Sequence, residues 1–219
     1  ERNRVAINFD IAEGDVAKIR GINVVGNKVF KDGDLLDEFV LRTPGWLTWY
    51  SKNDQYSKPK LQADLANLRS FYLNQGYLEF TVDSTQVTIT PDKNDIFITV
   101  NVTEGKKFKV KEVKLAGDLI VPEAELKKLI KLKPGDVFSR ERLTESTKLI
   151  QDRLGTEGYA FASINPVPEI DREKDEVTFT LYVDPGRRVY VRRIGVYGNT
   201  NTRDEVVRRE FRQFESSWY

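Results

Sequence analysis

The sequence has no cysteine and no histidine, and both absences narrow the chemistry open to the chain. Without cysteine it can form no disulfide, zinc–thiolate site or thiol nucleophile. Without histidine it lacks the commonest general base and the commonest metal ligand. The remaining residue types form no nucleophile–base pair and no spacing typical of metal ligands. We therefore expect a protein that is not an enzyme and that needs no metal or other cofactor.

Charge and hydropathy exclude two further classes of protein. The net charge is +1, which argues against a dedicated nucleic-acid-binding protein. No apolar run approaches the roughly 18 residues that a membrane-spanning helix requires. The content of 39% hydrophobic and 32% charged residues is typical of globular domains.

The chain repeats one pattern three times: a strand-like segment, a glycine, a second strand-like segment and a second glycine. The paired glycines are Gly14 with Gly26, Gly105 with Gly117, and Gly186 with Gly198. Each pair is 12 residues apart, whereas successive copies are 91 and 81 residues apart. Such a period indicates an array of small domains. The copies are out of phase with the ends of the chain, so we expect an incomplete domain at each end.

The first complete domain is expected at residues 15–105, in the order strand, helix, helix, strand, strand. Its predicted elements lie at about residues 18–25, 34–41, 58–75, 78–90 and 96–104. The second helix is the clearest, because Leu61, Leu65, Leu68 and Tyr72 form one apolar stripe. Gly76 follows it, where a left-handed C-terminal cap belongs.

The second complete domain is expected at residues 106–186 and repeats this order. Its opening strand is predicted at about residues 108–115, its short helix at about 122–131 and its closing strand at 177–183. Residues 1–14 are interpreted as the closing strand of a preceding domain.

Residues 187–219 are interpreted as the opening strand and first helix of a following domain. Thr202 and Glu205 fit a capping box for that helix. Val207, Phe211 and Phe214 are expected to form its core-facing stripe.

Each complete domain is predicted to be an α+β fold with both helices on one face of a three-stranded mixed sheet. The short turn between the last two strands makes them antiparallel neighbours. The first strand then pairs parallel with the third through a right-handed crossover, which gives the strand order 1-3-2. The second strand is therefore expected on an edge of the sheet.

The two predicted edge strands differ in proline. The strand of the second domain contains Pro166 and Pro168, which block further pairing because proline has no N–H to donate. The strand of the first domain has none, and its apolar positions shift in phase, which predicts a β-bulge near residues 83–86. Beyond the bulge, Gln86, Val87, Thr88, Ile89 and Thr90 form a candidate edge for an added partner strand. Alternatively, Val87 and Ile89 simply face the helices and complete the core; both interpretations can hold together.

Two further groups of residues are weaker candidates. Trp46, Trp49 and Tyr50 lie in an insertion of the first domain and either anchor a partner or fold back on their own domain. Near the C-terminus, Arg208, Arg209, Arg212 and Glu215 suggest a charged docking face, for which a solvated helix face is the alternative.

Several runs resemble the POTRA domains of the Omp85 family of outer-membrane proteins. The matching segments are LRSFYLNQGY at 68–77, DSTQV at 83–87, TPDK at 90–93, VNVTEG at 100–105, YVRRI at 190–194 and RREFRQ at 208–213. They are similar to the third and fifth POTRA domains of the members that assemble outer-membrane proteins. The resemblance covers essentially the whole chain. It implies that the two complete domains are the third and fourth POTRA domains.

The resemblance implies a periplasmic scaffold that binds unfolded outer-membrane β-barrel proteins by β-augmentation and docks the lipoproteins BamB and BamD. The third domain's edge strand would pair with extended chains, and the fifth domain would dock BamD through an acidic residue that corresponds to Glu215. Membrane contact is expected only through a C-terminal barrel outside this chain, and no nucleic acid is implied. The alternatives are the POTRA arm of an Omp85-type secretion protein and a cell-division structural protein with a single such module.

Overall fold

The computed structural model describes residues 17–43 and 53–218. The contacts divide the chain into two compact units. Of the described residues, the first unit contains those up to Phe71 together with Glu79–Gly105, and the second contains Tyr72–Leu78 together with those from Lys106 onward. The predictions for residues 1–14 and for Trp46, Trp49 and Tyr50 fall outside the described residues.

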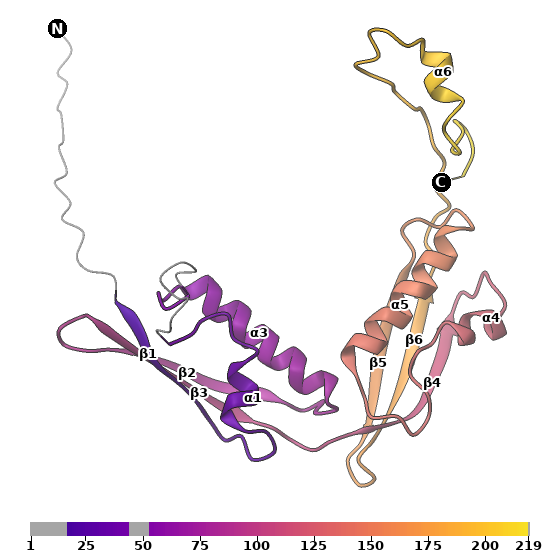
Figure 1. Cartoon of the computed structure of the whole chain (residues 1–219). Helices are drawn as coiled ribbons and strands as arrows, with labels where there is room; N and C mark the ends of the chain where they lie inside the picture. The colour runs from indigo at the N-terminus through magenta and orange to yellow at the C-terminus, as the bar shows by residue number, and fades with distance from the viewer. Residues whose placement is uncertain (1–16, 44–52, 219) are drawn as a thin grey trace, which may run out of the picture. The chain divides into compact units, whose positions relative to one another are not determined.

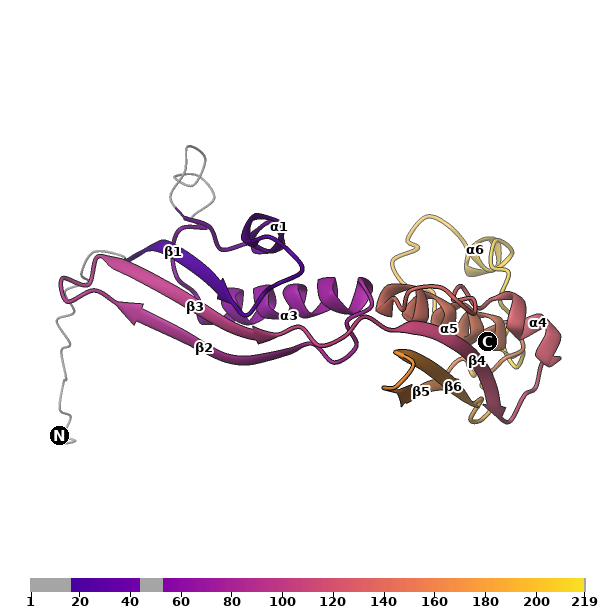
Figure 2. The same cartoon turned by 90° about the horizontal axis from the view of Figure 1, so that it is seen from below.

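The first unit is built on a three-stranded sheet in the order β1-β3-β2. Its strands are β1 (Lys18–Val25), β2 (Thr81–Ile89) and β3 (Asp95–Thr103), and its helices are α1 (Asp32–Leu36) and α3 (Lys58–Asn74). β1 runs parallel to β3, and β2 runs antiparallel to it. The helices cover one face of the sheet, and β2 lies at the edge opposite β1 (Figures 1 and 2). The predicted fold class and strand order are confirmed.

The core of the first unit lies between the helices and the sheet. Every second residue of β3 is buried, from Ile96 to Val102, because strand side chains alternate between the two faces. Leu61 and Leu68 of α3 are buried as part of the helical stripe. The residues that β2 and β3 place on the opposite face are mostly polar, among them Gln86, Thr88 and Thr99, and Phe97 on that face is 42% exposed.

The second unit repeats the arrangement with the strand order β4-β6-β5. Its strands are β4 (Lys109–Gly117), β5 (Ser163–Asp171) and β6 (Glu176–Asp184), and its helices are α4 (Glu123–Lys128) and α5 (Arg140–Gly155). Its buried cluster includes Val110, Leu126, Ile150 and Leu181. The short helix α6 (Asp204–Arg208) follows near the C-terminus (Figure 1).

The first helix of each unit is shorter than the sequence predicts. α1 ends at Leu36, because the N–H groups of Val40 and Leu41 donate to the buried carboxylate of Asp64 at 2.8 and 3.0 Å. α4 ends at Lys128, because the Lys131 N–H donates to the buried Ser146 hydroxyl at 2.8 Å. In both units a buried polar side chain of the second helix thus binds the amide groups that a longer first helix would use internally.

The predicted capping box near the C-terminus is wrong. α6 begins at Asp204 after Arg203, with no side-chain cap, and the Thr202 carbonyl accepts a hydrogen bond from the Asn199 amide at 3.0 Å. The predicted core-facing stripe is wrong as well. The helix ends before Phe211 and Phe214, which are 43% and 69% exposed.

Candidate functional site

The free edge of β2 is the candidate site of the first unit. β2 pairs with β3 from Thr81 opposite Thr103 to Ile89 opposite Ile96. The register shifts between Val82 and Ser84, so the predicted bulge is confirmed there. Within residues 17–43 and 53–218, the sheet order gives β2 a neighbour on one side only, and its other side is available for a further strand.

The direction of the backbone groups decides which residues of β2 a partner strand can reach. The Thr90 N–H donates to the Asp95 carbonyl at 3.0 Å, so the backbone of Thr90 faces β3. Successive residues of a strand point their peptide groups to opposite sides. Thr88 and Gln86 therefore also face β3, whereas Ile89, Val87 and Thr85 point their N–H and C=O groups outward.

Only two of the five candidate edge residues thus offer outward peptide groups. Val87 and Ile89 do so, while Gln86, Thr88 and Thr90 hold β2 to β3. Thr85 is an outward residue that the sequence analysis missed. The bulge and the position of the turn were both visible in the sequence, and counting back from the turn in steps of two would have identified it.

The side chains of the edge make it apolar on one face and polar on the other. Val87 and Ile89 lie opposite the buried residues Ile98 and Ile96, on the face that carries the helices. They are nevertheless 36% and 54% exposed, so they join the core only in part. Gln86 and Thr88 lie on the open face of the sheet. An added strand would meet apolar side chains on one side and polar side chains on the other.

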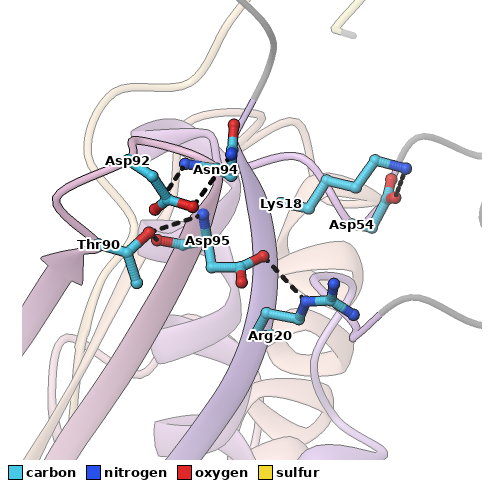
Figure 3. A network of polar contacts seen from close by, with 7 residues as sticks. All are labelled: Lys18, Arg20, Asp54, Thr90, Asp92, Asn94 and Asp95. Atoms are coloured by element: carbon cyan, nitrogen blue, oxygen red, sulfur yellow. Dashed lines mark hydrogen bonds and ion pairs between the residues drawn. The ribbon is translucent and has the colours of Figure 1, made fainter.

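Hydrogen bonds at the turn fix the end of this edge (Figure 3). The Asp95 N–H donates to the Thr90 hydroxyl at 3.1 Å, and the Asp95 carboxylate accepts from Arg20 Nε of β1 at 2.9 Å. The Asn94 amide donates to Asp92 at 3.0 Å. The Thr90 hydroxyl, followed by the amide groups of Asn94, lowers the pKa of Asp92. These contacts hold the hairpin in one register, which pre-organises β2 for a partner.

An ion pair joins the same end of the unit to the segment before α3. Lys18 Nζ lies 3.1 Å from the carboxylate of Asp54, which is buried (Figure 3). The Ile19 N–H also donates to the Asp54 carbonyl at 2.8 Å. The outer side of β1 is therefore occupied at its start, whereas no other described segment pairs with the outer side of β2 at the corresponding end.

The corresponding edge of the second unit is closed by proline. Pro166 and Pro168 of β5 pair with Leu181 and Phe179 of β6 and correspond to Thr85 and Val87 of β2. They therefore occupy outward positions, where a partner strand would need an N–H donor. Two successive donors are missing from this edge.

The C-terminal candidates separate into two groups. Arg208 and Glu215 contact each other at 3.0 Å and together bind the peptide groups of Ile194. The Ile194 N–H donates to Glu215 at 2.9 Å, and the Ile194 carbonyl accepts from Arg208 at 2.7 Å. The Ile194 N–H, followed by Arg208, lowers the pKa of Glu215.

Arg209 and Arg212 form the second group. Both are exposed, and among the described residues neither has a carboxylate within ion-pair distance. Arg208 and Glu215 thus hold the local structure, while Arg209 and Arg212 are available to a partner.

Residues 17–43 and 53–218 contain neither a candidate metal site nor a candidate membrane span. No group of three or more acidic, cysteine or histidine side chains could hold a metal ion there. No helix in that part of the chain is long and apolar enough to cross a membrane.

Comparison with known proteins places these features in a family. The POTRA family model, described as a surface antigen variable number repeat, matches residues 17–105 and 108–186. The outer membrane protein assembly factor BamA of Neisseria meningitidis is 40% identical over the whole chain, which covers 28% of that protein. BamA of Buchnera aphidicola is 31% identical, and the chain covers 36% of it. The chain thus spans about a third of the length of these relatives.

A solved structure has the same fold. The crystal structure of POTRA domains 3–5 of Haemophilus influenzae BamA matches with a TM-score of 0.78 and 30% identity. The match covers 94% of this chain and 80% of that one. The chain therefore belongs to the POTRA family, and it is similar along its whole length to the POTRA repeats of BamA proteins.

Proposed function

We propose that the chain is a scaffold of outer-membrane protein assembly that binds unfolded β-barrel proteins along β2. The observation that carries this proposal is the row of outward peptide groups at Thr85, Val87 and Ile89. An extended segment can pair with them through main-chain hydrogen bonds, whatever its detailed sequence. The names of the BamA relatives support assembly as the process in which this pairing is used.

The two faces of the edge favour barrel strands among extended segments. Strands of membrane barrels alternate apolar and polar side chains. Paired with β2, such a strand places its apolar side chains beside Val87 and Ile89 and its polar side chains beside Gln86 and Thr88. A uniformly polar segment would leave the two exposed apolar side chains uncovered, and a uniformly apolar one would expose its second face to water.

Docking of accessory lipoproteins is the second part of the proposal. BamB would bind near the β2 edge, and BamD would bind the C-terminal piece. Arg209 and Arg212 supply exposed positive charge for the second contact, and Glu215 keeps the segment around Ile194 in place. In this scheme residues 15–105 and 106–186 are the third and fourth domains, with pieces of the second and fifth at the ends.

Binding, without covalent chemistry, is the proposed mode of action. The chain belongs to the periplasmic portion of an outer-membrane protein, where barrel proteins pass before they insert. Weak pairing through a few peptide groups suits a transient hold, because each main-chain hydrogen bond contributes only about 1 kcal/mol net.

Binding of a labelled barrel-strand peptide by Val87→Pro tests the proposal. Proline removes the central outward N–H, and Pro168 of β5 indicates that the fold accepts proline at this position. We expect affinity, measured by fluorescence anisotropy, to fall roughly fivefold or more, because the loss of one main-chain hydrogen bond costs about 1 kcal/mol. Val87→Thr is the matched control, since it keeps the N–H and the branched shape and should bind as the parent does. Equal affinity of the parent and the proline variant would contradict β-augmentation at β2.

A further inference from the structure

The second unit has another edge strand, β4, which begins the sheet order β4-β6-β5. Its start is covered by the chain's own backbone. The Val110 N–H donates to the Asp136 carbonyl at 2.8 Å, and the Val110 carbonyl accepts from the Gly135 N–H at 2.7 Å. The segment that contains Gly135 and Asp136 thus acts as a short neighbour for the first residues of β4.

Among the described residues, the rest of β4 has no such neighbour. Val110 is buried toward the helices, and its peptide groups point away from β6. Side-chain face and backbone direction are coupled along a strand, so Val113 and Leu115, which pack on the same core, also point their peptide groups away from β6. In the described part of the chain, no backbone group outside the sheet is bonded to either residue.

A hollow of about 320 Å³ lies beside this free segment. Its apolar lining includes Val113, Ile130 and Leu132, and its basic lining includes Lys127, Lys128 and Lys133. The lining also contains Glu112, whose carboxylate lies 3.8 Å from Nζ of Lys114, so the three lysines of the hollow outnumber its acidic residue. This volume is at the lower end of the range for ligand pockets and suits one or two aliphatic side chains. The apolar surface and the free peptide groups therefore occur at one place.

The lysines give the hollow a positive rim that the chain neutralises only in part. Lys127 is bonded to Glu123 at 2.8 Å, and this contact raises its pKa. Lys128 and Lys133 have no carboxylate within ion-pair distance among the described residues. A partner that brings carboxylates to the rim would form ion pairs with Lys128 and Lys133.

We propose that the free edge of β4 binds an acidic, extended polypeptide segment of another protein. The segment adds to the sheet as a strand beside Val113 and Leu115. One of its aliphatic side chains fills the hollow, and its carboxylates pair with Lys128 and Lys133. This site lies in the second unit and does not depend on the β2 edge of the first.

The test uses the whole chain and two labelled peptides of about eight residues, long enough to pair along one edge. One alternates glutamate with valine, and the other alternates lysine with valine. We expect the acidic peptide to bind and the basic one to bind weakly. The double variant Lys128→Glu with Lys133→Glu should weaken acidic-peptide binding by roughly three- to tenfold. Val113→Pro should weaken binding as well, because it removes an outward N–H from β4 just as Pro166 lacks one on β5.

Matched controls separate this site from nonspecific charge and from the β2 edge. All binding is measured in a Val87→Pro background, in which the β2 edge lacks its central outward N–H. In that background Lys148→Glu with Lys174→Glu changes the net charge equally at exposed lysines outside the hollow and should leave binding of the acidic peptide unchanged. Chemical-shift changes in NMR spectra should map to residues 112–115 and 127–134. Three results would overturn the proposal: an equal loss in the control pair, equal binding of both peptides, or shifts that map elsewhere.

Discussion

Val87 and Pro168 occupy equivalent positions in the two units. Val87 of β2 lies opposite Ile98, and Pro168 of β5 lies opposite Phe179, which is the corresponding residue of the central strand. Both residues have their side chains on the helix-bearing face and their backbone nitrogens toward the free side. The edges of β2 and β5 therefore have the same geometry and differ in one donor: Val87 offers an outward N–H, and Pro168 has none.

Replacing the prolines should convert the closed edge into an open one. The variant Pro166→Thr with Pro168→Val gives β5 the residues found at the equivalent positions of β2. We expect this variant to gain a second binding site for barrel-strand peptides, measured as an increase in stoichiometry by titration calorimetry. The restored donors are the reason, since the ladder to β6 does not use these nitrogens.

Combining the open β5 edge with Val87→Pro provides the control for that experiment. The combined variant should keep one site, now in the second unit, and chemical shifts should move to residues 163–171. If opening β5 added no binding at all, outward N–H groups would not be what limits strand addition in this chain.

The repeated glycines Gly26 and Gly117 should tolerate no side chain. Both have positive φ, and a Cβ atom would lie 2.1 Å from the Val102 carbonyl oxygen and 2.3 Å from the Val183 carbonyl oxygen. We expect Gly26→Ala or Gly117→Ala to lower the free energy of unfolding by roughly 2–4 kcal/mol. Urea denaturation followed by circular dichroism measures the change.

Gly33 is the matched control, because it lies in α1 with nothing within 4 Å of an added Cβ atom. Gly33→Ala should be neutral or stabilise the chain by up to about 1 kcal/mol. A loss at Gly26 or Gly117 no larger than the change at Gly33 would mean that the backbone relaxes around the new side chain.

The regular part of the fold was predictable because local patterns and topology rules agree. The stripe of α3, the turn between β2 and β3 and the repeated glycines left one reasonable sheet order, and the bulge followed from the phase shift of apolar residues. The ends of α1 and α4 were not predictable in this way. Asp64 and Ser146, which lie in the second helix of each unit, determine where the first helix ends. Such hydrogen bonds between residues far apart in the sequence cannot be recognised from a short stretch of sequence.

The candidate site was predictable as a strand but not residue by residue. Sequence patterning shows which side chains alternate, whereas the direction of each peptide group depends on which neighbour a strand finds. Glu215 illustrates the same limit, because its contact with Ile194 joins residues of two different segments. The prediction of an apolar helical stripe at Phe211 and Phe214 was wrong because α6 ends at Arg208.

Removing the buried carboxylate of Asp64 should destabilise the first unit. In Asp64→Ala the N–H groups of Val40 and Leu41 lose their acceptor inside the protein, and each unsatisfied buried group costs about 1–3 kcal/mol. We expect the free energy of unfolding to fall by roughly 3 kcal/mol in urea denaturation. Asp64→Asn should lose less, since its carbonyl oxygen still accepts one of the two hydrogen bonds.

The equivalent Ser146→Ala removes one acceptor and should cost about half as much as Asp64→Ala. Its hydroxyl also donates to the Arg142 carbonyl at 2.6 Å, but that helical carbonyl is already available to the backbone ladder. Equal stability of Asp64→Ala and the parent would show that water reaches these amide groups.

Acid should release the segment around Ile194 because Glu215 titrates there. Its pKa is lowered by the Ile194 N–H and by Arg208, so the ionised form is the one that the fold favours. The contribution is therefore fully present above the ordinary glutamate pKa of about 4.3, and it is lost as the pH falls through the lowered value. The Ile194 amide resonance, followed by NMR between about pH 6 and pH 2, should shift and lose protection from exchange over that range. Glu215→Gln keeps an oxygen acceptor without a titrating group, so its Ile194 amide should stay constant over the same range. A parent resonance that is equally constant would mean that the carboxylate does not hold this segment.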